Sequence, residues 1–145
     1  MPDRLSGSLE LPDGAVIRGR GLRNPIPDGP HPEYGLYLGS SRLRARHDAA
    51  LTWSHDWLDW PDFRLPRDSD AAIAAIRALH RRALAGERVE VACNGGVGRT
   101  GTVLSCLAIL AGVPAPEAVG WIRAHYSERA VETPWQRRWV LAFPA

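Results

Sequence analysis

The chain has 145 residues, the usual length of one domain, and 45% of them are apolar and 23% charged. This balance is typical of a folded globular domain and excludes a disordered chain or a coiled coil. A formal net charge of +2 is too small to indicate a nucleic-acid partner. Two cysteines make no disulfide framework, and the sequence shows neither a membrane-length apolar run nor a signal-peptide core. We therefore expect one cytoplasmic domain over 1–145, monomeric and without a nucleic-acid or membrane partner.

The N-terminal part of the chain is rich in proline and glycine. Residues 1–33 indicate an irregular segment packed on the core, with a short strand possible over 15–20. Alternating apolar residues that end in Gly-Ser predict a strand over 34–40. Residues 42–50 are ambiguous and hold one helical turn or two. The aromatic stretch 50–60 contains a further predicted strand, which ends before the proline that follows.

The apolar spacing changes to that of a helix after Asp68. We predict a helix over 69–85, with Asp68 or Ser69 as its N-cap and Gly86 just past its end. A buried strand is predicted after it over 88–93, followed by a buried helix over 102–112. Two shorter helices are predicted to begin at Pro116 and at about Pro134. Helices alternating with strands predict an α/β fold: a single domain with a central, mostly parallel sheet flanked by helices.

The most informative stretch is VEVACNGGVGRTG, residues 89–101, in which a strand, a glycine-rich loop and a helix start follow one another. Glycines let successive backbone N–H groups turn toward one centre, and a helix N-terminus adds its positive dipole end, so the loop is an anion cradle. The guanidinium of Arg99 can grip two oxygens of a phosphate. The same surroundings stabilise a thiolate, so we expect Cys93 to be nucleophilic at neutral pH. The alternative is an inert buried cysteine at a strand end.

Three motifs in one order resemble a known family. The pattern C-x-x-G-x-G-R-T-G, which begins at Cys93, resembles the signature loop of the cysteine-dependent protein tyrosine phosphatases, including their dual-specificity branch. DWPDFRLP, residues 59–66, resembles the mobile loop that carries the general acid of that family. ETPWQRRWV, residues 132–140, resembles the late loop whose glutamine orients water. The resemblance covers 34–143 and implies a compact, dual-specificity-like phosphatase.

The resemblance also implies a role for each motif residue. Cys93 attacks phosphorus, Arg99 grips the equatorial oxygens, and Asp62 protonates the leaving oxygen, with Asp59 and then Asp56 as rival acids. The phosphate is bound through backbone N–H groups of the loop, those of Asn94, Gly95, Gly96, Val97 and Gly98.

Two more residues act in the second step that the resemblance implies. Gln136 holds the attacking water, unless it is an exposed helix glutamine. The hydroxyl of Thr100 donates to the Cys93 sulfur, unless it caps the helix instead, and both roles can hold at once. Arg64 and Arg67 could receive an acidic substrate flank, although a solvated face is the favoured interpretation.

One departure leaves alternatives open. The family usually carries histidine immediately before the catalytic cysteine, where this chain has Ala92. We expect a phosphatase of phosphate monoesters, first of phosphotyrosine and then of phosphoserine or phosphothreonine in proteins, acting through a cysteinyl-phosphate. The alternatives are a catalytically weak phosphate-binding module, or a phosphatase of phosphoinositides or small phosphate esters. The five histidines show no metal-binding spacing, so we expect no metal and no other cofactor.

Overall fold

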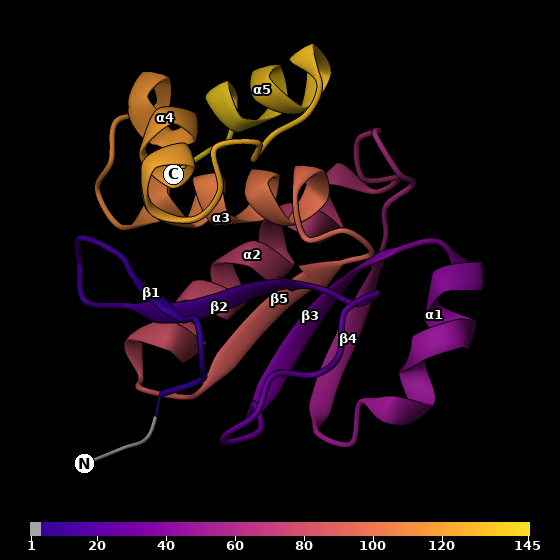
Figure 1. Cartoon of the computed structure of the whole chain (residues 1–145). Coiled ribbons are helices and arrows are strands. Elements are labelled where there is room, and N and C mark those ends of the chain that lie inside the picture. The colour runs from indigo at the N-terminus through magenta and orange to yellow at the C-terminus, as the bar shows by residue number, and fades with distance from the viewer. Residues whose placement is uncertain (1–3) are drawn as a thin grey trace.

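A computed structural model describes residues 4–145, which form one α/β domain (Figure 1). The strands are β1 (Leu9–Glu10), β2 (Val16–Gly21), β3 (Tyr34–Gly39), β4 (Ser54–Asp59) and β5 (Val89–Cys93). The helices are α1 (Ser41–His47), α2 (Ser69–Leu84), α3 (Gly98–Leu110), α4 (Ala115–His125) and α5 (Pro134–Leu141), with a single 3-10 turn at Asp48–Ala50. The predicted α/β fold is therefore confirmed. None of the helices in the described part of the chain is long and apolar enough to cross a membrane.

The sheet has the order β1-β2-β5-β3-β4, and only β1 runs antiparallel to its neighbour. All five residues of β5 are buried, as expected for the central strand of a parallel sheet. Figure 1 shows α2, α3, α4 and α5 on one side of the sheet and α1 on the other. Because the neighbouring strands are parallel, the carboxyl end of β5, where Cys93 lies, is flanked by the carboxyl ends of β2 and β3.

The N-terminal segment contributes more than irregular chain. The strand expected over 15–20 is β2, one residue further along, and it pairs directly with β5. The short strand β1 was not predicted, because two residues are too few to show an alternating pattern. The ambiguous stretch 42–50 holds α1 and the 3-10 turn that follows it.

The helix predicted over 102–112 begins four residues earlier than expected, at Gly98. Its first turn, Gly-Arg-Thr-Gly, has poor intrinsic helix propensity, and packing decides its conformation. A Cβ at Gly101 would lie 2.7 Å from the Cβ of Ala130, so glycine allows the chain after α4 to approach α3 closely. This early start puts Arg99 and Thr100 on the helix itself rather than on the loop.

The face of the sheet toward α1 holds a buried ionic cluster. Glu90 on β5 accepts hydrogen bonds from Arg18 at 2.9 and 2.6 Å, from Arg20 at 2.9 Å and from Tyr37 at 2.7 Å. Burial, followed by the charge of Glu90, raises the pKa of Tyr37 above its usual range, so its hydroxyl remains a donor. The cluster joins β2, β3 and β5 beneath the edge that carries Cys93.

Candidate active site

The loop after β5 is held against the sheet edge by the continuation of β2. The backbone N–H of Leu22 donates to the carbonyl of Cys93 at 2.8 Å, and that of Arg23 donates to the carbonyl of Asn94 at 3.1 Å. Gly96 has φ +75°, and a Cβ there would lie 2.6 Å from the backbone of Arg20, so the turn requires glycine. The loop therefore curls back on itself between the end of β5 and the start of α3.

Two donors converge on the Cys93 sulfur, which is 2% exposed. The N–H of Gly96 donates to Sγ at 3.2 Å, and the hydroxyl of Thr100 donates to it at 3.1 Å. The same hydroxyl oxygen accepts the Cys93 N–H at 2.9 Å. Thr100 does not cap α3, because the N-cap residue is Val97, which makes no side-chain capping bond. Both donors are placed to stabilise negative charge that develops on the sulfur during a reaction.

Arg99 is held so that one edge of its guanidinium is left for a ligand. Its Nη1 donates to the carbonyls of Leu38 at 3.3 Å and Trp60 at 2.9 Å, and the residue is only 4% exposed. Its Nη2 lies 3.3 Å from a carboxylate oxygen of Asp62, and its Nε has no hydrogen-bond partner among residues 4–145. A buried donor without a partner is costly unless a ligand satisfies it.

Asp62 lies on a short loop whose conformation is stabilised by a buried tryptophan and by local hydrogen bonds. Trp60 is fully buried and its indole N–H donates to the carbonyl of Arg64 at 2.7 Å. The N–H of Phe63 donates to the Asp62 carboxylate at 3.0 Å, and Phe63 has φ +59°, a left-handed conformation that is uncommon for a bulky residue. The loop thereby directs the Asp62 carboxylate toward Arg99.

The other two carboxylates considered as acids lie elsewhere. Asp59 pairs with Arg67 at 3.0 Å, and Asp56 accepts the hydroxyl of Tyr34 at 2.6 Å. The ion pair with Asp59 also occupies Arg67, one of the two arginines considered for an acidic substrate flank.

Cys93, Arg99 and Asp62 line one cavity of 200 Å³. Four loop residues predicted to bind phosphate through their backbone, Asn94, Gly95, Val97 and Gly98, also line this cavity. The remaining lining residues were not predicted from the sequence: Arg23, Phe63, Arg129 and Glu132. Gly96 is not part of this wall, since its N–H faces the sulfur.

Glu132 is the most important of the residues that were missed. Its carboxylate lies so close to Gly98 that a Cβ at that position would require the Glu132 side chain to move. The only signal for Glu132 in the sequence is that it opens the motif of residues 132–140, in which the glutamine drew attention instead.

Gln136 lies behind the cavity rather than in its wall. It is fully buried, so the interpretation as an exposed helix glutamine is wrong. Its side-chain N–H donates to the carbonyl of Arg64 at 3.3 Å, and its side-chain oxygen accepts the N–H of Glu132 at 3.0 Å. The neighbouring Trp135 donates its indole N–H to the carbonyl of Phe63 at 2.6 Å. Gln136 thus joins the start of α5 to the Asp62 loop, and its role in placing water remains a prediction.

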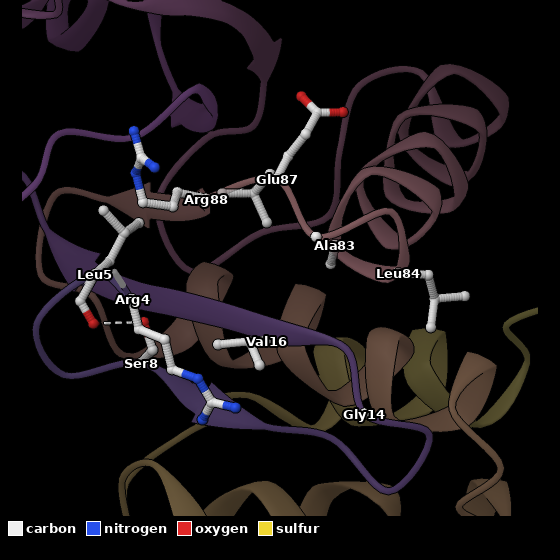
Figure 2. A pocket seen from close by; sticks show the side chains of 11 residues that line it. Arg4, Leu5, Ser8, Gly14, Val16, Ala83, Leu84, Glu87 and Arg88 are labelled. Carbon is white, nitrogen blue, oxygen red and sulfur yellow. Dashed lines mark hydrogen bonds between the residues drawn. The ribbon is translucent and has the colours of Figure 1, made fainter. Parts of the chain in front are cut away.

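A second, larger cavity of 270 Å³ lies near the beginning of β5, at the end opposite to Cys93 (Figure 2). It is lined by residues of the N-terminal segment and of the α2–β5 connection, with apolar side chains such as Leu5, Val16 and Leu84. Its charged side chains have partners: Arg4 pairs with Glu10, and Arg88 with Glu33. None of the described residues that line it is a cysteine or a histidine, so the cavity at Cys93 is the candidate active site.

Comparison with known proteins links this geometry to one family. The model of the PTP-SAK family, described as a Swiss Army Knife protein, DSP-PTPase phosphatase domain, matches residues 58–139. Two uncharacterized proteins of Methanocaldococcus jannaschii are 47% and 44% identical over 58 and 57 residues, which are 40% and 39% of this chain. The match spans 38% and 35% of those proteins, well under half of their length.

Solved structures share the fold. Tk-PTP in its active form has a TM-score of 0.67 at 20% identity, with 94% of each chain covered. The kinase associated phosphatase, with its catalytic-site cysteine replaced by serine, also has a TM-score of 0.67, at 11% identity, with 86% of this chain and 82% of that chain covered.

Proposed function

The chain belongs to the DSP-PTPase phosphatase domains of the PTP-SAK family, and from this premise we propose that it hydrolyses phosphate monoesters through a phosphocysteine on Cys93. The observation that carries the proposal is the convergence at one cavity of a sulfur with two hydrogen-bond donors and a buried arginine with an unpartnered Nε. A phosphate dianion seated there would satisfy that donor. A displacement at phosphorus needs a nucleophile and a fixed phosphate-binding group that both contact the same substrate.

The first step transfers the phosphoryl group to the enzyme. The thiolate of Cys93 forms a bond to phosphorus while the bond between phosphorus and the leaving oxygen breaks. Asp62, as the carboxylic acid, gives its proton to that oxygen.

The second step releases phosphate. Water attacks the phosphocysteine, the sulfur–phosphorus bond breaks, and the proton of the water passes to the Asp62 carboxylate. The Thr100 hydroxyl, 3.1 Å from Sγ, stabilises the departing thiolate. Gln136 supports this step indirectly, because its bonds to Arg64 and Glu132 hold together the two loops that meet at the cavity.

We infer that phosphotyrosine in proteins is the preferred substrate and that phosphoserine and phosphothreonine come second. Phe63 lines the cavity and is 51% exposed, which offers an aromatic surface to the ring of a phosphotyrosine entering the site. The rival activity toward phosphoinositides or small phosphate esters is tested with the same enzyme preparation. A turnover screen over phosphotyrosine, phosphoserine and phosphothreonine peptides and soluble phosphoinositides, without added metal, ranks these classes.

The nucleophile is tested by Cys93→Ser. We expect this variant to lose turnover while it still binds phosphate or vanadate, because the backbone cradle and Arg99 remain. Residual turnover above a few per cent of the wild-type rate contradicts the covalent mechanism. A wild-type protein that binds phosphate but turns over none of the substrates supports the alternative of a weak phosphate-binding module.

The acid is tested by comparing two carboxylates of the same cavity, Asp62 and Glu132. Asp62→Asn should slow a phosphotyrosine peptide, a substrate with a poor leaving group, by about 10²–10⁴-fold. The loss should be much smaller for an activated aryl phosphate, whose leaving group needs no proton. If Glu132→Gln shows this dependence on the leaving group and Asp62→Asn does not, Glu132 is the acid.

A further inference from the structure

Two arginines of α1 border the candidate active site from the side of the sheet opposite to α3. Arg42 and Arg46 lie one helical turn apart and line a cavity of 160 Å³. Three residues of that cavity, Asp62, Asn94 and Arg99, also line the cavity of Cys93. The two cavities therefore adjoin each other, and an anion held by the α1 arginines would lie next to a phosphate in the cradle.

Neither arginine has a partner in the described part of the chain. The side chains of Arg42 and Arg46 make no hydrogen bond and no ion pair with residues 4–145, and both residues are exposed. Some exposed arginines elsewhere in the chain do have such partners: Arg67, for example, pairs with Asp59 at 3.0 Å, and Arg4 with Glu10 at 2.8 Å.

The local sequence of α1 supplies no counter-charge for this pair. The helix α1 contains no acidic residue, and like charges one turn apart repel each other. A positive charge in the first turn of a helix is also unfavourable, because the macrodipole is positive there. Arg46, in the last turn, is favoured by the macrodipole, whereas Arg42, in the first turn, is not. Helix stability therefore does not explain Arg42 or its placement one turn from a like charge.

The charge around the two cavities exceeds what one phosphate requires. Five arginines line them, against two carboxylates: Arg23, Arg42, Arg46, Arg99 and Arg129, against Asp62 and Glu132. This local balance of +3 is larger than the formal net charge of the whole chain, +2, so the rest of the chain is slightly acidic. A single dianion in the cradle leaves positive charge over. Of the five arginines only Arg99 has an ion pair with a described residue, and two of the other four, Arg42 and Arg46, lie on α1.

We propose that Arg42 and Arg46 form a subsite for a second anionic side chain of the substrate, so that the domain prefers phosphotyrosine next to an acidic or phosphorylated residue. This inference rests on the proposed phosphatase function. Residues of an extended peptide are about 3.3–3.6 Å apart along the chain, so the long side chain of a residue one or two positions from the phosphotyrosine can reach an adjoining cavity. A peptide fits better than an inositol bisphosphate, because these cations lie on a separate helix and not within the loop NGGVG that surrounds the scissile phosphate.

The test compares phosphotyrosine peptides that differ only in the residues beside the phosphotyrosine, which are alanine, glutamate or phosphoserine. For the wild-type protein at low salt, kcat/KM should be roughly five- to twenty-fold higher with acidic flanks, the effect of two partly exposed ion pairs. The preference should decrease as salt rises. The double variant Arg42→Gln/Arg46→Gln should bring the ratio close to one.

The matched control is Arg44→Gln. This arginine lies between the other two in the sequence but lines a different cavity, so the variant should keep the wild-type ratio. A wild-type ratio near one, or an equal loss of preference in the control, overturns the inference. A preference for soluble inositol bisphosphates that depends on Arg42 and Arg46 overturns the peptide assignment.

Failure of the proposed function would look different. If the wild-type protein turns over none of the peptides, the phosphatase assignment fails. The same three peptides are then compared by their binding to Cys93→Ser. An acidic preference in binding that disappears with Arg42→Gln/Arg46→Gln supports the subsite without catalysis, and its absence refutes the subsite.

Discussion

The hydroxyl of Thr100 is the most informative single group to remove. It donates to the Cys93 sulfur at 3.1 Å and accepts the Cys93 N–H at 2.9 Å, and the residue is fully buried. Thr100→Val removes both hydrogen bonds while it keeps the branched shape of the side chain. One of the two donors to the sulfur is lost, and the N–H of Gly96 remains.

The size of the effect follows from these two bonds. A hydrogen bond to a charged group contributes about 1.5–3 kcal/mol. One pH unit corresponds to about 1.4 kcal/mol, so the pH midpoint for alkylation of Cys93 should rise by about one to two units. The Cys93 N–H loses its partner in a buried position, which should lower the free energy of unfolding by about 1–3 kcal/mol.

The assay is alkylation of the folded protein by iodoacetamide at a series of pH values, read by peptide mapping. Cys106 is an internal check of folding: it is fully buried on α3, and burial raises the pKa of its thiol well above the usual range. It should stay unlabelled as long as the domain is folded.

Thr100→Ser is the matched control, because it keeps the hydroxyl, and its midpoint should stay near that of the wild-type protein. A folded Thr100→Val variant with an unchanged midpoint would refute the reasoning and leave Thr100 only a role in holding the loop. Kinetics give a second readout: if water attacks a phosphocysteine whose thiolate leaves poorly, a burst of aryl alcohol should precede a slower steady state.

Three further outcomes are expected from other parts of the structure. Tyr126→Phe removes a 2.5 Å hydrogen bond to the carbonyl of Gly96. We expect the free energy of unfolding, measured by urea denaturation, to fall by about 1 kcal/mol and kcat/KM to fall several-fold. Unaltered kinetics would contradict a role of Tyr126 in positioning the loop. Glu90→Gln leaves two buried arginines without their counter-charge and should cost about 3–5 kcal/mol of unfolding free energy by urea denaturation; a cost below about 1 kcal/mol would show that the cluster is not a tightly coupled one. His55 lies 2.7 Å from Asp48, and although burial alone would lower the pKa of the imidazole, its hydrogen bonds to a backbone carbonyl and to this carboxylate raise it overall. Stability from a raised pKa is fully present below about pH 6.5 and is lost as pH rises through the folded-state value, so His55→Gln should lower Tm by about 1–3 °C at pH 6 and by less at pH 9; an equal loss at both pH values contradicts this linkage.

The sequence by itself was sufficient to predict the strand, the glycine-rich loop and the helix that follow one another in the proposed phosphate cradle, because this arrangement is local. A strand, glycines that permit a tight loop and a helix start follow within the thirteen residues 89–101, so their chemistry can be recognised without knowing what surrounds them. The same holds for α2, whose apolar spacing and N-cap at Asp68 set its limits to within a residue. Even here the first turn of α3 was missed, because the contact of Gly101 with Ala130 that stabilises it is tertiary.

Only the tertiary structure decided which charged groups surround the cradle. Arg23, Arg42 and Glu132 come from three segments that are far apart in the sequence. Arg23 and Arg42 lie in no pattern that distinguishes them from other charged residues, and Glu132 lies in a motif in which the glutamine drew attention instead. All 18 basic residues are arginine, so residue type alone does not distinguish the arginines near Cys93 from the others. The position of Asp62 beside Arg99 likewise depends on two carbonyls that hold the guanidinium, those of Leu38 on β3 and of Trp60 just after β4. Such choices depend on distances across the fold, because charge–charge interactions act through space and not along the chain.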